Sequence, residues 1–246
     1  MGRYFEQEFT VDSRAVDMFR QCRPSALLGY MQEAATLASL DLGASGPEIL
    51  AKYNCIWMIA RLWVEMDKPL AWNDRFTVRT WHRKTAGASV YRDFDLFQDG
   101  VPIGQGVSTW VMADVDSRRL FRMRSLAEFQ GTDGGELCKD IKLHRVPMPE
   151  RFDSRELRAM RYSDTDINGH INNIHYADFA CDALHLERRG QGKFARRFQI
   201  GYVGECRAGE TIWIDTAAGE DRLCARGVGE DGSERFDFSL ELADLK

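Results

Sequence analysis

The chain has 246 residues, enough for one large domain or two small ones, and its 44% hydrophobic and 11% aromatic residues are typical of a packed globular core. The net charge of −5 argues against general nucleic-acid binding, and no apolar run approaches the roughly 18 residues of a membrane span. The six cysteines form no CxxC pair, and neither a zinc-type ligand spacing nor a glycine-rich phosphate loop is present. We therefore expect free thiols and no metal or organic cofactor. Because the N-terminus carries no apolar signal segment, we also expect a cytoplasmic protein.

The first half of the chain predicts a strand, a helix and an antiparallel meander. Apolar residues repeat at helical spacing after Pro24, which suits a first helical turn, and Gly43 and Gly46 end this pattern. Asp99-Gly100 lies between two alternating runs and predicts a hairpin. The expected strands are 5–11, 56–67, 76–80, 89–97 and 101–113.

The second half repeats this order. We expect a helix over 173–186 and strands over 157–162, 197–206, 212–215, 223–228 and 235–242, with a second Asp-Gly turn at 231–232. A long helix wrapped by one antiparallel sheet, used twice, is the tandem hotdog plan of the α+β class. The expected divisions are an N-terminal hotdog over 1–130, a linker over 131–153, and a C-terminal hotdog over 154–246.

The densest group of polar side chains lies at 161–176, which reads RYSDTDINGHINNIHY. Its acids, amide and histidine fall on alternate positions: Asp164, Asp166, Asn168 and His170. In an extended backbone these side chains would converge on one face. Asn172-Asn173 then offers an N-cap for the following helix. A polar loop that only caps a helix is the simpler interpretation, but this concentration of groups favours a site.

This stretch resembles the acyl-acyl carrier protein (acyl-ACP) thioesterases, the plant plastid enzymes and their bacterial relatives. The matching residues are Ser163-Asp164, Asp166, Asn168, His170, Asn172-Asn173 and Tyr176, followed downstream by Tyr202 and Glu205-Cys206. The resemblance implies hydrolysis of the thioester between a fatty acyl chain and ACP, which ends chain elongation. It also implies catalytic roles for Asp166, Asn168, His170 and Glu205, with Cys206 as a further candidate.

Thioester hydrolysis needs an activated water and donors for the developing oxyanion. Glu205 can deprotonate water, His170 can polarise it or protonate the leaving thiolate, and Asn168 can donate to the carbonyl, while Asp166 orients the others. The rival mechanism makes Cys206 a nucleophile with His170 as its base. Because neighbours on a strand face opposite sides, we predict that Cys206 packs among apolar residues and Glu205 faces the site.

The expected substrate has an acyl chain at one end and ACP at the other, and each would need its own binding surface. The acyl chain needs an apolar wall, for which the candidates are Leu27, Met31, Ala35, Trp57, Ile59 and Tyr176. ACP is acidic and so is this chain, so docking requires a local basic patch. The main candidate is Arg188, Arg189, Lys193, Arg196 and Arg197, and the alternative is Arg118, Arg119, Arg122 and Arg124.

Three other interpretations stay open. The carrier of the acyl group can be coenzyme A instead of ACP. Hotdog enoyl-thioester hydratases and dehydratases also use Asp-x-Asn followed by His, but with a proline and one more residue between, whereas Gly169 alone separates Asn168 from His170 here. A non-catalytic acyl-binding hotdog would need no base such as Glu205. By analogy with the fold, a homodimer is a further expectation.

Overall fold

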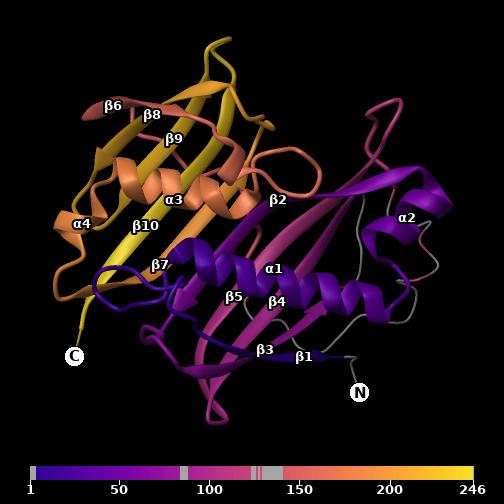
Figure 1. Ribbon diagram of the computed structural model, residues 1–246, viewed down its shortest axis with the longest axis horizontal. Coiled ribbons are helices and arrows are strands. Elements are labelled where there is room, and N and C mark those ends of the chain that lie inside the picture. Colours follow the sequence, from indigo (N-terminus) through magenta and orange to yellow (C-terminus); the bar gives the residue numbers. More distant parts are fainter. Residues whose placement is uncertain (1–3, 84–87, 123–125, 127, 129–140, 246) are drawn as a thin grey trace. The chain divides into compact units, whose positions relative to one another are not determined.

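The computed structural model describes residues 4–83, 88–122, 126, 128 and 141–245 (Figure 1). The chain forms two compact units, and neither is continuous in sequence. Unit 1 contains Met1–Thr10, Gly29–Val64 and Asp74–Leu143, and unit 2 contains Val11–Leu28, Glu65–Asn73 and His144–Lys246. Residues 131–140 of the expected linker lie outside the described part of the chain.

Unit 1 has the strand order β1-β3-β4-β5-β2, with antiparallel pairing of β3 to β1 and β4 and of β4 to β5. Its elements are β1 (Phe5–Thr10), α1 (Pro24–Asp41), α2 (Gly46–Tyr53), β2 (Cys55–Met66), β3 (Arg75–His82), β4 (Ser89–Gln98) and β5 (Val101–Asp114). The first residues of α1 and the last of β2 belong to unit 2. The predicted hairpin is confirmed, because Asp99 and Gly100 both have positive φ, 51° and 77°.

Small side chains bring α1 close to the sheet of unit 1. Ala34, Ala35 and Ala38 are buried on the helix. Met31 is fully buried, and its terminal methyl occupies the space that a Cβ at Gly106 in β5 would need. The ring of Tyr30 contacts that of Phe76 in β3 at 5.3 Å between centroids. The helix therefore packs on the sheet through alanines and one flexible thioether.

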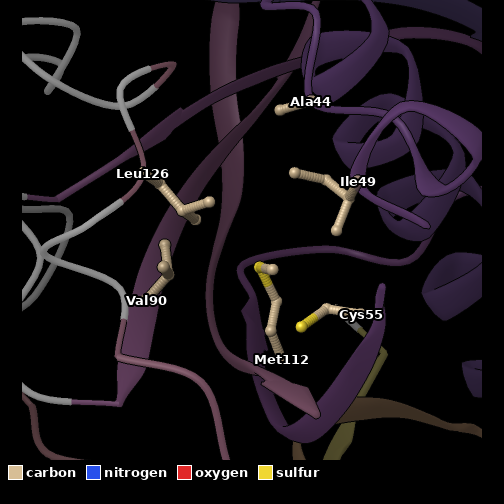
Figure 2. Packing of buried hydrophobic residues seen from close by; sticks show 6 residues of the cluster. All are labelled: Ala44, Ile49, Cys55, Val90, Met112 and Leu126. Atoms are coloured by element: carbon tan, nitrogen blue, oxygen red, sulfur yellow. The ribbon is translucent and has the colours of Figure 1, made fainter. Parts of the chain in front are cut away.

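The sequence analysis missed the short helix α2. Its start carries a capping signal, since Glu48 accepts from the backbone N–H of Ser45 at 2.9 Å, Pro47 follows in the first turn, and Asn54 ends the helix in the left-handed region. Ile49 of α2 contributes to a buried cluster, shown in Figure 2, with Ala44, Cys55, Val90, Met112 and Leu126. The Ser-x-x-Glu spacing at 45–48 was the local signal for this helix.

Unit 2 has the antiparallel strand order β7-β10-β9-β8-β6. Its elements are β6 (Ser154–Ala159), a 3-10 turn at Tyr162–Asp164, α3 (Asn173–Ala183), α4 (Leu186–Arg189), β7 (Lys193–Tyr202), β8 (Thr211–Ala218), β9 (Leu223–Gly229) and β10 (Glu234–Asp244). Helix α3 packs across β8, β9 and β10 (Figure 1). With α1 on its sheet in unit 1, this arrangement confirms the tandem hotdog.

Three expected elements of unit 2 end earlier than predicted. The strand over 157–162 stops at Ala159, and Tyr162 begins a 3-10 turn. The helix over 173–186 stops at Ala183, because His185 adopts a positive φ of 54° before α4 begins. The strand over 197–206 stops at Tyr202, so Glu205 and Cys206 lie in the loop that follows β7. The prediction that these two residues alternate along a strand was therefore wrong, although their side chains still diverge, as described below.

Each unit also contains a buried aspartate whose carboxylate is hydrogen-bonded to arginine. In unit 1 the carboxylate of Asp93, fully buried, accepts two hydrogen bonds from Arg83 at 2.6 and 2.7 Å. In unit 2 the carboxylate of Asp215 accepts from Arg155 at 2.6 Å and from Arg226 at 3.0 Å. The hydrogen bond from Arg155, with a smaller contribution from Arg226, holds the pKa of Asp215 below its usual range.

Candidate active site

The polar stretch folds as a turn and not as an extended segment. Thr165 and Ile171 form an isolated antiparallel bridge, and between them the backbone N–H of Asp166 donates to the carbonyl of His170 at 2.8 Å. Gly169 has a φ of 75°, which favours glycine. The prediction of four polar side chains alternating on one face was therefore wrong. The groups of the site are brought together by chain reversal.

The carboxylate of Asp166 organises this turn. Its Oδ1 accepts from the backbone N–H groups of Asn168 at 2.8 Å and His170 at 3.3 Å. Its Oδ2 accepts from the side-chain amide of Asn168 at 3.2 Å. One amide N–H of Asn168 is thus bound to Asp166, and the Asn168 side chain has a second N–H on an exposed residue. Asp166 acts on the site through the residues it orients.

Asp164, which belongs to the matching motif, has a different position. It is buried, and its carboxylate accepts from the backbone N–H of Arg161 at 2.8 Å. Its carbonyl accepts from the N–H of Asn172, the residue whose side chain caps α3 through the N–H of Ile174. Asp164 therefore joins the turn to the helix and does not face the reacting groups.

The loop after β7 is fixed to both the turn and α3. The backbone N–H of Ile171 donates to the carbonyl of Cys206 at 2.9 Å, and the N–H of Cys206 donates to the hydroxyl of Tyr176 at 3.0 Å. Cys206 is fully buried, and burial raises the pKa of its thiol. A protonated thiol without solvent access is a poor nucleophile. The predicted packing of Cys206 in the interior is confirmed.

Glu205 turns the other way, with its side chain 49% exposed. Its Oε2 lies 3.6 Å from Nε2 of His170. The same Nε2 lies 3.1 Å from Nη2 of Arg207, a residue that the sequence analysis missed. The only sequence signal for Arg207 was its place directly after Glu205-Cys206. The turn and the loop together present a carboxylate, an imidazole, an amide and a guanidinium to solvent.

Two exposed large apolar side chains lie on the same segment of the chain, and neither was singled out from the sequence. Ile167, between Asp166 and Asn168, is 102% exposed, and Tyr162 is 90% exposed. An isolated exposed apolar residue is ordinary, but both of these lie on the segment that carries the polar groups. They therefore lie near the polar groups in sequence.

The six candidate residues for the acyl wall are divided between the two units. Met31, Ala35 and Ile59 are buried in unit 1, and Trp57 of that unit donates its indole N–H to the carbonyl of Ala44 at 3.0 Å. Leu27 and Tyr176 belong to unit 2. A cavity of about 20 Å³ in unit 1 has room for roughly one water molecule, and residues such as Ala38 and Thr80 line it.

The main basic cluster is partly engaged in contacts within unit 2. Arg189 donates to the carbonyl of Leu184 at 2.9 Å, and Arg197 pairs with Glu241 at 2.9 Å and with Glu65. Arg188 is 75% exposed, although it lies 3.3 Å from Glu187. Lys193 and Arg196 are exposed. In the alternative cluster Arg118, Arg119 and Arg122 are exposed, and Arg124 lies outside the described residues.

The described residues contain neither a membrane-spanning helix nor a cluster of metal ligands. None of the helices in this part of the chain is both long and apolar enough to cross a membrane. Within the same residues, no group of three or more His, Cys, Asp or Glu side chains is arranged to hold a metal ion.

The fold and the site define a double hotdog with an acid, amide and histidine turn in its second unit. The sequence matches the acyl-ACP thioesterase N-terminal domain over residues 2–127 and the acyl-ACP thioesterase C-terminal domain over residues 149–239. The chain belongs to the acyl-ACP thioesterase family.

Individual relatives agree with this assignment. The chain is 28% identical over 219 residues to the chloroplastic palmitoyl-acyl carrier protein thioesterase of Arabidopsis thaliana, covering 83% of this chain and 53% of the relative. It is 24% identical over 199 residues to a chloroplastic acyl-[acyl-carrier-protein] hydrolase of Cuphea viscosissima, covering 76% and 48%. The chain thus spans about half the length of these curated relatives.

Solved structures share the fold along nearly the whole chain. An acyl-ACP thioesterase from Bacteroides thetaiotaomicron superposes with a TM-score of 0.87 at 21% identity, and a 12:0-ACP thioesterase from Umbellularia californica with 0.86 at 20%. Each match covers 98% of both chains. At these identities the likeness concerns the fold.

Proposed function

We propose that the protein hydrolyses the thioester of a fatty acyl-ACP, releasing free fatty acid and ACP and ending chain elongation. The observation that carries this proposal is the convergence of Glu205 and His170 beside Asn168, whose amide is oriented by Asp166. Membership of the family supports the reaction type. A binding protein would have no need of a half-exposed carboxylate next to an imidazole.

In the proposed reaction Glu205 accepts a proton from water, and the water oxygen attacks the thioester carbonyl carbon. The second amide N–H of Asn168 donates to the oxyanion that develops on the carbonyl oxygen. The carbon–sulfur bond then breaks, and the thiolate takes up the proton that Glu205 accepted. One water is consumed for each acid and thiol formed, and the carboxylate is regenerated. Cys206 takes no covalent part, because its thiol is buried and protonated.

The acyl chain, in this proposal, lies against α1 within unit 1. The side chain of Met31 would move to admit the acyl chain, because an unbranched thioether over a glycine can change rotamer with little steric resistance. Ala35 and Ile59 are further candidate contacts in the same unit. The proposal assigns ACP docking to the exposed Arg188 and Arg196, where an acidic carrier gains electrostatic attraction.

The test is release of thiol from a panel of acyl-ACPs and the matching acyl-CoAs, with the wild type beside Glu205→Gln and Cys206→Ala. Loss of a general base lowers turnover by about 10²–10⁴-fold, so Glu205→Gln should be nearly inactive while Cys206→Ala remains active. Circular dichroism of both variants controls for folding. A folded Cys206→Ala protein without turnover would instead indicate a nucleophilic cysteine.

The panel also separates the alternatives. Preference for one carrier at equal chain length distinguishes acyl-ACP from acyl-CoA as the substrate. A MaoC-like dehydratase from Phytophthora capsici has a TM-score of 0.53 to this chain, so the architecture by itself does not distinguish hydrolysis from hydration. Hydration of enoyl thioesters, without thiol release, would replace the thioesterase proposal.

A further inference from the structure

We infer that Arg207 is a positioning residue that holds His170 in the neutral tautomer with its proton on Nδ1, so that the Glu205 carboxylate stays available as the base. This inference deepens the proposed function and rests on it for its catalytic consequence. Its structural part, the tautomer of His170, stands on the contacts of these three residues alone.

The direction of the hydrogen bond follows from the chemistry of arginine. A guanidinium carries only donors and is protonated at any physiological pH. Nη2 of Arg207 lies 3.1 Å from Nε2 of His170, a distance at which a hydrogen bond forms. Because Arg207 can only donate, Nε2 must accept, and the ring proton of a neutral imidazole is then on Nδ1.

Glu205 competes for the same ring nitrogen. Its Oε2 lies 3.6 Å from Nε2 of His170, which is beyond a direct hydrogen bond but close enough to form one after a small rotation. An imidazole nitrogen has one bonding direction in the ring plane, so Nε2 either accepts from Arg207 or donates to Glu205. The shorter contact belongs to Arg207.

The backbone around Arg207 holds it in this place. Its N–H donates to the carboxylate of Glu210 at 3.1 Å, and its carbonyl accepts from the N–H of Glu210 at 3.1 Å. The intervening Gly209 has a φ of 93° and donates to the carbonyl of Met160 at 3.0 Å. Arg207 therefore projects from a closed turn that is tied to the end of β6, which limits its freedom to leave His170.

Removal of the Arg207 guanidinium should allow Nε2 of His170 to bind Glu205 instead. Without Arg207, the ring proton of His170 moves to Nε2, and this N–H then donates a hydrogen bond to the carboxylate of Glu205. That hydrogen bond stabilises the carboxylate as an anion and occupies one of its lone pairs, which weakens it as a base. The expected consequence is a fall in kcat with little change in KM, because the chemical step is affected and the acyl chain is not.

The tautomer is measured directly by long-range ¹H–¹⁵N correlation on the full chain labelled at histidine, at about pH 8, above the ordinary pKa of histidine. The chain has five histidines, and a His170→Gln spectrum assigns the signal of interest. We compare Arg207→Gln, Arg207→Lys and the control Arg151→Gln, which removes the same charge from an exposed residue in the segment before β6.

The wild type and Arg151→Gln should show His170 protonated on Nδ1, and Arg207→Gln should show it protonated on Nε2. Arg207→Lys, which keeps a donor and the charge, should retain much of the wild-type pattern. Wild-type protein protonated on Nε2, or an Arg207→Gln spectrum unchanged from the wild type, would overturn the inference. This readout needs no turnover, so it remains decisive if the proposed hydrolysis fails.

The kinetic arm uses the acyl thioester that the wild type hydrolyses best. We expect Arg207→Gln to lower kcat by about tenfold, a barrier change of about 1.4 kcal/mol, with Arg207→Lys partly restored and Arg151→Gln unchanged. A rise in KM alone would instead indicate that Arg207 contacts the carrier, and would overturn the positioning role.

Discussion

The two units share one architecture but place different side chains beneath their helices. The part of α1 that belongs to unit 1 presents alanines and Met31, whose methyl fills the space over Gly106. In unit 2 the 11-residue α3 presents Tyr176 and Phe179. The ring of Tyr176 contacts those of Phe236 at 5.5 Å and Tyr202 at 6.0 Å between centroids.

This difference shows how one fold separates adaptability from rigidity. A thioether over a glycine can repack at low cost, which suits the acyl site proposed for unit 1. Aromatic rings have few rotamers and fixed contacts, and the hydroxyl of Tyr176 also binds the backbone of Cys206. Through this hydrogen bond the rigid interface is joined to the loop that carries Glu205 and Cys206.

The largest expected effect concerns the buried aspartate of unit 1. Asp93→Asn leaves Arg83 without its carboxylate in a buried site, so the free energy of unfolding should fall by about 3–5 kcal/mol. Urea denaturation of the intact protein measures it. The control is Asp95→Asn in the same strand, where burial already raises the pKa of the carboxyl and loss of the charge should cost little. Equal losses of unfolding free energy in the two variants would show that the pair of Asp93 and Arg83 does not stabilise the fold more than Asp95 does.

The adaptable interface is tested by a double-mutant cycle. Met31→Ala should cost about 2–5 kcal/mol through the cavity it leaves. Gly106→Ala alone should cost about 1–3 kcal/mol, because the added methyl meets Met31 and lies 3.1 Å from the carbonyl oxygen of Trp63. In the double variant the new methyl enters the vacated space. The double variant should therefore lose less free energy of unfolding than the sum of the losses in the two single variants.

A matched cycle serves as the control for this interface. Leu28→Ala removes a buried α1 side chain that is not among the nearest neighbours of a Cβ at Gly106, and it should combine additively with Gly106→Ala. If the proposed acyl site is right, Met31→Ala also shifts the product profile towards longer chains, whereas Leu28→Ala leaves it unchanged. Additive losses in the Met31 cycle would show that the two residues do not share the space.

The rigid interface of unit 2 predicts an effect of intermediate size. Tyr176→Phe keeps the ring but removes the acceptor for the buried N–H of Cys206, which should lower the free energy of unfolding by about 1–3 kcal/mol. Turnover should fall too, because the loop that carries Glu205 loses a constraint. Tyr202→Phe is the control, since its hydroxyl has no hydrogen-bond partner in the described chain. Similar losses in both variants would remove the case for this hydrogen bond.

The smallest expected effect is the acid sensitivity of Asp215. Its folded pKa is lowered, chiefly by Arg155, relative to the unfolded value of about 3.9. The stabilisation is therefore present above about pH 4 and is lost as the pH falls through the folded pKa. Because the Arg155 side chain is 53% exposed, about 1 kcal/mol or less is expected.

Urea denaturation between about pH 5 and pH 2.5 measures this contribution. The slope of the free energy of unfolding against pH should be shallower in Asp215→Asn than in the wild type. Asp221→Asn, at an exposed position, should leave the slope unchanged. An unchanged slope in Asp215→Asn would mean that its two arginines do not bind it more strongly than solvent does.

The sequence by itself determined the elements and the composition of the candidate site. Alternating apolar residues and the Asp-Gly pairs specify strands and hairpins through local backbone preference, and these signals placed most strands within a few residues of their ends. The motif at 161–176 also identified the family, because its residues and spacing are local features. The capping signal of α2 was equally local and was overlooked.

Only the tertiary structure decided the geometry of the site. The turn at Asp166–His170 is joined to Cys206 through the N–H of Ile171, a bond between segments far apart in sequence. Spacing along the chain contains no information on such a bond, so it predicted an extended row of side chains where a turn forms. The same holds for Arg207 on His170 and Tyr176 on Cys206: residue identity gives each group its chemistry, but the packing of α3 and the loop after β7 decides which groups meet.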